Sequence, residues 1–115
     1  LEASGFELQV EGLASLQMES LFYRARENRR DPGEQSADYK NSEYERSKRC
    51  YDALEGLVDQ FTEPVNMAHL SVVASLGYAD WRHPDDGWRH NRLKLTAWFD
   101  QMMQQPSCVE TKPIF

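Results

Sequence analysis

Apolar residues recur every three or four positions along most of this 115-residue chain, and its prolines fall at the ends of the periodic segments. Since an α-helix completes a turn in 3.6 residues, such spacing gathers apolar side chains on one face of a helix. Strands are not indicated, because no run of β-branched and aromatic residues alternates with polar ones. The sequence therefore predicts an all-α fold, a bundle of four to five helices that forms one domain over residues 1–115.

Proline-containing breaks divide the chain into its expected helices, which cover residues 6–29, 36–60, 66–81 and 90–105. Pro32, Pro64 and Pro106 stand at three of the breaks, where they interrupt helical hydrogen bonding. Asn66 is placed to cap the third helix, because its side-chain oxygen can accept an N–H group two or three residues later. Residues 107–115 are expected to form a tail over the bundle.

The third expected helix carries small residues within an apolar row, which predicts that it is the buried helix of the bundle. Small side chains such as Ala74 and Gly77 would let a neighbouring helix approach closely. The row assigned to this buried face consists of Leu70, Val73, Ala74, Gly77, Tyr78 and Trp81.

The charge balance argues against nucleic acid as a partner. Acidic residues outnumber basic ones nineteen to thirteen, for a formal net charge of −6, and the basic residues are scattered. Phosphate binding needs Lys and Arg gathered in a basic stripe. No signal-peptide pattern opens the chain, and its longest apolar stretch, Leu70 to Tyr78, is too short to span a bilayer. We therefore expect a cytoplasmic protein with no nucleic-acid or membrane partner.

The cysteines and histidines show no metal-binding pattern. Cys50 and Cys108 lack the spacing of a zinc or redox motif, so we expect two reduced thiols, at least one of them buried. His69, His83 and His90 lack the four-residue spacing with a carboxylate that a helical metal site requires. No metal cofactor is expected.

Three segments resemble bacterial glutathione S-transferases. Trp-Phe-Asp-Gln-Met-Met-Gln-Gln-Pro-Ser at 98–107, with Thr-Lys-Pro at 111–113, is similar to the last helix and tail of that family, with Gln105 in place of the usual Arg. The segment 70–82, ending Leu-Gly-Tyr-Ala-Asp-Trp-Arg, is similar to its core helix. The segment 12–20 resembles a helix that often reads Ala-Leu-Ala-Asp-Gly-Ile-Met-Asp-Ala. The pieces follow the family's order over nearly the whole chain.

The resemblance implies the all-helical C-terminal domain of a glutathione S-transferase. In that family an N-terminal thioredoxin-like domain, expected to be missing from this chain, binds the co-substrate glutathione and activates its thiol. The chain alone is therefore expected to be inactive and to contain no catalytic residue. In the two-domain parent it would form the wall on the side of a small electrophilic substrate and a homodimer surface. The alternative is a non-catalytic helical module that mediates protein association.

Two departures from the family pattern bear on stability and on the substrate. The family usually opens its core helix with Ser or Thr and an Asp three residues later, whereas this chain has Asn66 and His69. A protonated His69 would oppose the positive end of the helix dipole, so we expect a weaker helix start at low pH. Ser15 and Leu16 replace a frequent Asp-Gly, which alters the helix face that usually points toward the cleft between domains.

One polar stripe on the first helix is the candidate substrate-binding surface. Helical spacing puts Ser15, Glu19, Tyr23 and Arg26 on one face, where they could line the cleft between the two domains. The alternative is that the stripe is merely solvated or faces a dimer partner. A second group, Arg82, Arg89 and Arg92, could receive an anion or could simply occupy the solvated ends of two helices.

Overall fold

The computed structural model describes residues 5–61 and 65–104 and shows four α-helices and three short 3₁₀ turns over that range, with no strand. The α-helices are α1 (Gly5–Asn28), α2 (Ala37–Leu57), α3 (Met67–Arg82) and α4 (Leu93–Met102). The 3₁₀ turns are η1 (Pro32–Glu34), η2 (Val58–Gln60) and η3 (Pro84–Asp86). The predicted all-α helical bundle is confirmed. The expected tail at 107–115 lies outside the described residues.

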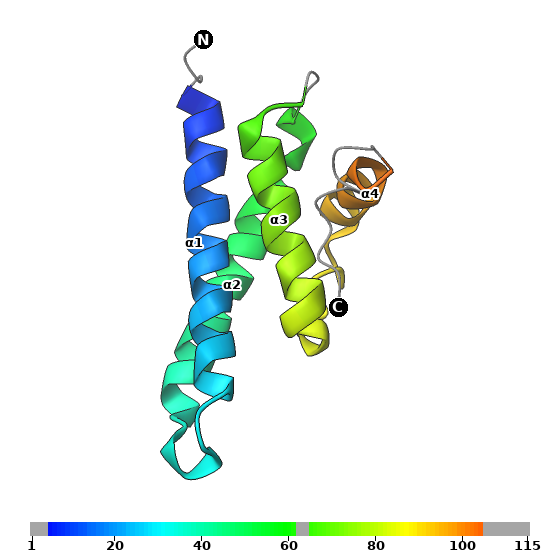
Figure 1. The fold of residues 1–115 in the computed structure, drawn as a ribbon. Coiled ribbons are helices and arrows are strands. Elements are labelled where there is room, and N and C mark those ends of the chain that lie inside the picture. Colours follow the sequence, from blue (N-terminus) through cyan, green and yellow to red (C-terminus); the bar gives the residue numbers. More distant parts are fainter. Residues whose placement is uncertain (1–4, 62–64, 105–115) are drawn as a thin grey trace.

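The helices form a bundle in which α1 contacts both α2 and α3 (Figure 1). α1 and α2 run antiparallel and are joined by the turn that contains η1, and α3 lies alongside α1. α4 packs against α2 and α3 (Figure 1). None of the described helices is long and apolar enough to cross a membrane.

The core lies where α1, α2 and α3 meet and continues to α4. Its largest fully buried side chains include one indole and one phenol, those of Trp88 and Tyr51, whose rings are stacked with centroids 6.4 Å apart. Trp88 also meets the ring of Phe99 on α4 edge-on at 5.4 Å. Burial of such large apolar surfaces is the main force that holds the helices together.

Both α2 and α3 begin with a side-chain cap, of which the one at Asn66 was predicted. The Ser36 hydroxyl accepts the Tyr39 N–H group at 3.1 Å and begins α2. At α3 the Asn66 side chain accepts the His69 N–H group at 3.0 Å, while Nδ1 of His69 accepts the Asn66 N–H group at 3.3 Å. The histidine ring thus fills the place of the usual carboxylate in a capping box. The weaker start at low pH stays a prediction, with a second reason: a protonated ring has no acceptor at Nδ1.

The buried face of α3 differs from the predicted one. Ala74 and Trp81 are exposed, while Leu70, Gly77 and Tyr78 are only partly buried. Of the predicted row only Val73 is buried, and the buried residues of α3 are Ala68, His69, Val72, Val73, Ser75, Leu76 and Ala79. The prediction was wrong because α3 carries apolar residues on more than one side, and its position between α1 and α4 selects the side through Val72 and Leu76.

The last helix begins at Leu93, three residues later than the predicted His90. Asn91 has a left-handed backbone with φ of 59°, which interrupts a right-handed helix. Single-turn hydrogen bonds from the N–H group of His90 to the carbonyl of Gly87, and from that of Arg92 to Arg89, hold this segment as a turn.

Candidate functional site

The four predicted site residues all lie on α1. Ser15, Glu19 and Arg26 are exposed, and Tyr23 is half-buried. The predicted polar stripe is therefore a real surface of α1.

Only two of these four side chains lie against each other. The guanidinium carbon of Arg26 lies 5.8 Å from the centroid of the Tyr23 ring, and the Phe22 ring lies 6.5 Å from that of Tyr23. Glu19 instead reaches Arg46 of α2 at 3.8 Å. Within the described residues the Ser15 side chain makes no hydrogen bond. Tyr23, Arg26 and Phe22 thus form one cluster, and Ser15 and Glu19 lie apart from it.

The same face of α1 also carries exposed apolar residues that the predicted polar stripe did not include. Leu8, Leu16 and Phe22 of α1 are 59%, 46% and 45% exposed. Leu16 follows Ser15, and Phe22 precedes Tyr23. The helical period therefore places these apolar residues beside the polar stripe, and this spacing is the sequence signal that could have predicted them. We define these three residues together with Tyr23 and Arg26 as the α1 outer face. It offers apolar and aromatic area beside one cation, which suits an organic molecule better than a metal ion.

Cys50 is the one cysteine among the described residues. Cys50 is buried in α2, and burial raises the pKa of its thiol, although Arg46 and Arg49 oppose that shift. Since the thiolate is the reactive form, Cys50 is an inert core residue. Cys108 lies outside the described residues. No group of three or more His, Cys, Asp and Glu side chains within the described ranges could hold a metal ion.

A buried polar cluster holds the C-terminal half of α1 on the side that faces the core. Arg24 donates two hydrogen bonds to Asp86, at 2.7 and 2.6 Å, and the Tyr51 hydroxyl donates to the same carboxylate at 3.1 Å. Burial, together with the negative charge of Asp86, raises the pKa of Tyr51 well above its usual range. The bidentate pair lets the two buried charges compensate each other and ties α1 and α2 to η3, although Nε of Arg24 has no hydrogen-bond partner within the described residues.

His83 contacts the same half of α1. Its ring nitrogen Nε2 lies 2.9 Å from the carbonyl oxygen of Leu21, and because a carbonyl only accepts, Nε2 carries the proton. Burial lowers the pKa of His83, and the Arg24 guanidinium adds to that shift. The neutral ring is therefore the form that the fold selects.

The three arginines near the end of α3 do not form a common anion site. Arg89 pairs with Asp80 at 2.7 Å, and Arg92 pairs with Asp52 at 2.8 Å. Arg82 instead lies over the ring of Trp81, 3.8 Å from its centroid. Each cation has its own local partner, which favours the structural interpretation.

Comparison with known proteins gives one curated relative and several solved structures. No protein-family model matches the chain. The chain is 31% identical over 108 residues to the uncharacterized GST-like protein YibF of Escherichia coli K12, an alignment that covers 91% of this chain and 54% of that protein.

The solved structures cover nearly the whole of this chain. A glutathione transferase family member from Pseudomonas fluorescens Pf-5, crystallised with S-(propanoic acid)-glutathione, matches all of the chain and 62% of its own chain, with a TM-score of 0.94 and 26% identity. A glutathione S-transferase of Methylobacterium radiotolerans, in complex with glutathione sulfonate, matches 95% of this chain and 53% of its own chain, with a TM-score of 0.82. Because the two sequences are only 17% identical, this match supports a common fold and nothing further. The chain thus spans a little over half the length of these proteins.

Proposed function

Since this chain is related by sequence and fold to the glutathione S-transferase family, with the architecture of that family's C-terminal helical domain, we propose that it is the helical half of a two-domain transferase. An N-terminal thioredoxin-like domain of the parent would bind glutathione, and this half would provide the surface for a small electrophile and part of a homodimer interface. The reaction would be conjugation to, or reduction by, glutathione. The proposal places the parent in the cytoplasm, where glutathione is the thiol pool.

The observation that supports this most is the match of the whole chain to a glutathione transferase crystallised with glutathione itself, of which the chain covers 58%. The remainder of that protein has no counterpart in these 115 residues. Those further residues would contain the groups that bind glutathione and activate its thiol in the proposed parent.

The α1 outer face is the part of this chain that we assign to the electrophile. Phe22 and Leu16 supply exposed apolar area, and Tyr23 and Arg26 supply an aromatic ring and a cation. Desolvation of an apolar substrate against such side chains stabilises its complex by roughly 25 cal/mol for each Å² buried. The arrangement fits a substrate-binding role and not a catalytic one.

The first test is the intact mass of the protein as its full gene expresses it. We expect a polypeptide heavier than this chain by about 9 kDa, for roughly 80 residues of thioredoxin-like domain. That polypeptide should conjugate glutathione to an activated aryl halide, and the chain of 115 residues should not. Equal masses with no activity would contradict the proposal and favour the non-catalytic association module.

The second test assigns the electrophile surface within that longer protein. Replacement of the half-exposed Phe22 (F22A) should raise KM for the aryl halide several-fold, because apolar contact is lost, and should leave KM for glutathione unchanged. The matched control is Leu93→Ala, which removes an exposed leucine from α4. Equal effects of the two variants, or a change confined to glutathione, would exclude the α1 outer face as the electrophile surface.

A further inference from the structure

A second surface of the chain, independent of the α1 outer face, contains a pocket of about 440 Å³. Tyr44, Lys48 and Asp52, each four residues apart on α2, form one wall. The other wall is the segment 86–92 between α3 and α4, from which Asp86, Gly87, His90, Asn91 and Arg92 line the pocket. Its volume is in the range of small-molecule sites, and no residue of α1 lines it.

The loop wall of this pocket is held in a defined shape. Gly87 and Asn91 both have left-handed backbones, with φ of 58° and 59°. Between them the His90 N–H group donates to the Gly87 carbonyl at 2.9 Å. Arg92 donates a hydrogen bond to the Trp88 carbonyl at 3.1 Å and forms an ion pair with Asp52 at 2.8 Å. A ligand would therefore meet a wall that needs little ordering on binding.

Both carboxylates of the pocket are already neutralised. Asp86 receives two hydrogen bonds from Arg24 and one from the hydroxyl of Tyr51, and its side chain is 6% exposed. Asp52 is paired with Arg92. Each acid therefore already has a cationic partner, although the side chain of Asp52, unlike that of Asp86, is 70% exposed.

The uncommitted groups of the pocket can all donate hydrogen bonds, and Lys48 among them can only donate. Within the described residues no hydrogen bond is recorded for the Tyr44 hydroxyl, the His90 ring or the Asn91 amide. Lys48 pairs with Glu45 at 2.9 Å, but the two side chains are 38% and 47% exposed. An exposed pair of this kind is weak and exchanges readily for another anion. The ammonium also lies 4.7 Å from the Tyr44 ring centroid, which holds it beside the pocket.

We propose that this pocket binds a small organic anion, whose carboxylate or phosphate group is held by the Lys48 ammonium and by the donors of His90, Asn91 and Tyr44. An ammonium and three neutral donors favour an acceptor with negative charge, since charge-assisted hydrogen bonds are the strong ones. The site is separate from the electrophile surface and does not depend on transferase activity.

The test is a titration of the full chain with two probes, inorganic phosphate and benzoate, followed by amide NMR at constant ionic strength. We expect saturable shifts of the Gly87 and Asn91 amides with one or both probes, and the probe that binds distinguishes a phosphate from a carboxylate ligand. Lys48→Met (K48M) should weaken binding about tenfold or more, because it removes a charged donor. The matched control Arg49→Met removes the adjacent exposed cation, which does not line the pocket, and should leave binding unchanged.

Three results would overturn the proposal. They are the absence of saturable shifts with both probes, equal losses in the Lys48 and Arg49 variants, and unchanged binding in the Lys48 variant. Since Lys48 is partly exposed, its variant should fold normally, and His90→Ala, at an exposed position, provides a second, independent loss of a donor. None of these measurements uses glutathione, so their outcome is distinct from that of the transferase tests.

Discussion

At the scale of single residues, Gln17 of α1 is the least satisfied polar group of the core. Its side chain is fully buried, and within the described residues neither its carboxamide nitrogen nor its oxygen has a hydrogen-bond partner. A buried amide without a partner has lost its hydration and gained nothing in exchange, which costs about 1–3 kcal/mol. The resemblance noted above places an isoleucine at this position in related helices.

We predict that Gln17→Met raises the free energy of unfolding by about 1–2 kcal/mol, because the thioether fills a similar volume without an unpaired amide. Urea denaturation measures the change. Gln9→Met, at an exposed position of the same helix, should stay within about 0.5 kcal/mol of the parent chain. A destabilising Gln17→Met substitution would show that the amide has a partner in solution.

His83 makes stability depend on pH. The fold lowers the pKa of its ring, so below the unfolded pKa of about 6.5 the unfolded chain binds more protons than the folded chain. The contribution of His83 to stability is therefore complete above about pH 6.5 and is lost as pH falls toward the folded pKa.

We expect His83→Gln to reduce the loss of stability between about pH 7.5 and about pH 5.5, since glutamine does not titrate. Urea denaturation of both chains at these two pH values measures how steeply the free energy of unfolding changes with pH. The difference between the two chains is due to His83, because the carboxylates titrate in both proteins. Identical slopes in the two chains would mean that His83 does not carry this dependence.

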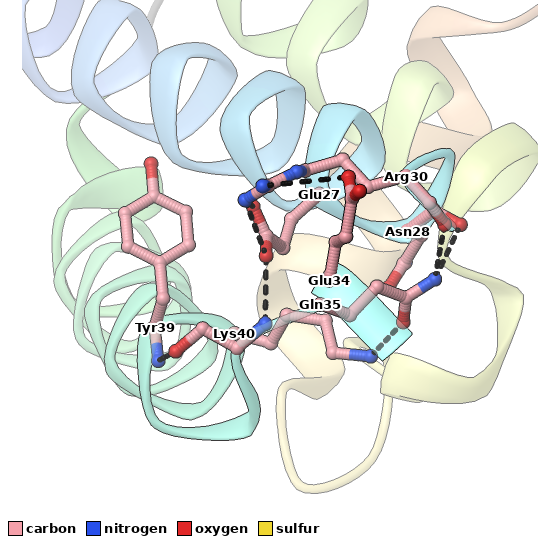
Figure 2. Close-up of polar contacts among 8 residues, drawn as sticks. Glu27, Asn28, Arg30, Glu34, Gln35, Tyr39 and Lys40 are labelled. Carbon is pink, nitrogen blue, oxygen red and sulfur yellow. Dashed lines mark hydrogen bonds and ion pairs between the residues drawn. The ribbon is translucent and has the colours of Figure 1, made fainter. Parts of the chain in front are cut away.

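At the scale of elements, the turn between α1 and α2 is closed by two side chains (Figure 2). Gln35 donates from its amide to the carbonyls of Asn28 and Arg30, at 3.1 and 2.8 Å, where α1 ends. Glu27 accepts the Ser36 N–H group at 2.7 Å, where α2 begins, and this bond lowers the pKa of Glu27. Groups that helices leave unpaired at their ends are thus satisfied across the turn.

We predict that Gln35→Ala lowers the free energy of unfolding by about 1 kcal/mol, because two carbonyls lose their donor. Glu34→Ala, in the same turn, removes only an exposed ion pair of 3.9 Å with Arg30 and should change stability by no more than about 0.5 kcal/mol. Thermal or urea denaturation compares the two variants. Equal effects would exclude the amide of Gln35 as the closing group.

At the scale of the whole molecule, most of the exposed large apolar side chains of the described residues lie on α1 and α3. Leu8, Leu16 and Phe22 of α1, and Met67 and Trp81 of α3, are between 37% and 66% exposed. Apolar patches of more than a few hundred Å² commonly mark contact surfaces. In the proposed parent, the N-terminal domain or a second subunit would cover them.

The isolated chain should therefore self-associate, and sedimentation velocity should show a sedimentation coefficient that rises with protein concentration. A double variant, Leu16→Ser and Phe22→Ser, should shift the equilibrium toward monomer. Leu93→Ser, which removes the exposed leucine of α4, should not. A monomeric profile of the unmodified chain at high concentration would contradict the prediction.

By itself the sequence determined the helices, the cap at Asn66 and the position of the polar stripe on one face of α1, because propensity, capping and periodicity are local properties. Only the tertiary structure decided which side of α3 is buried, since its apolar residues allow more than one face. It also decided that Arg24 meets Asp86, 62 residues away, and that Glu19 turns toward α2. The pocket beside Lys48 needs a loop from after α3 to meet a face of α2, a juxtaposition that packing alone creates.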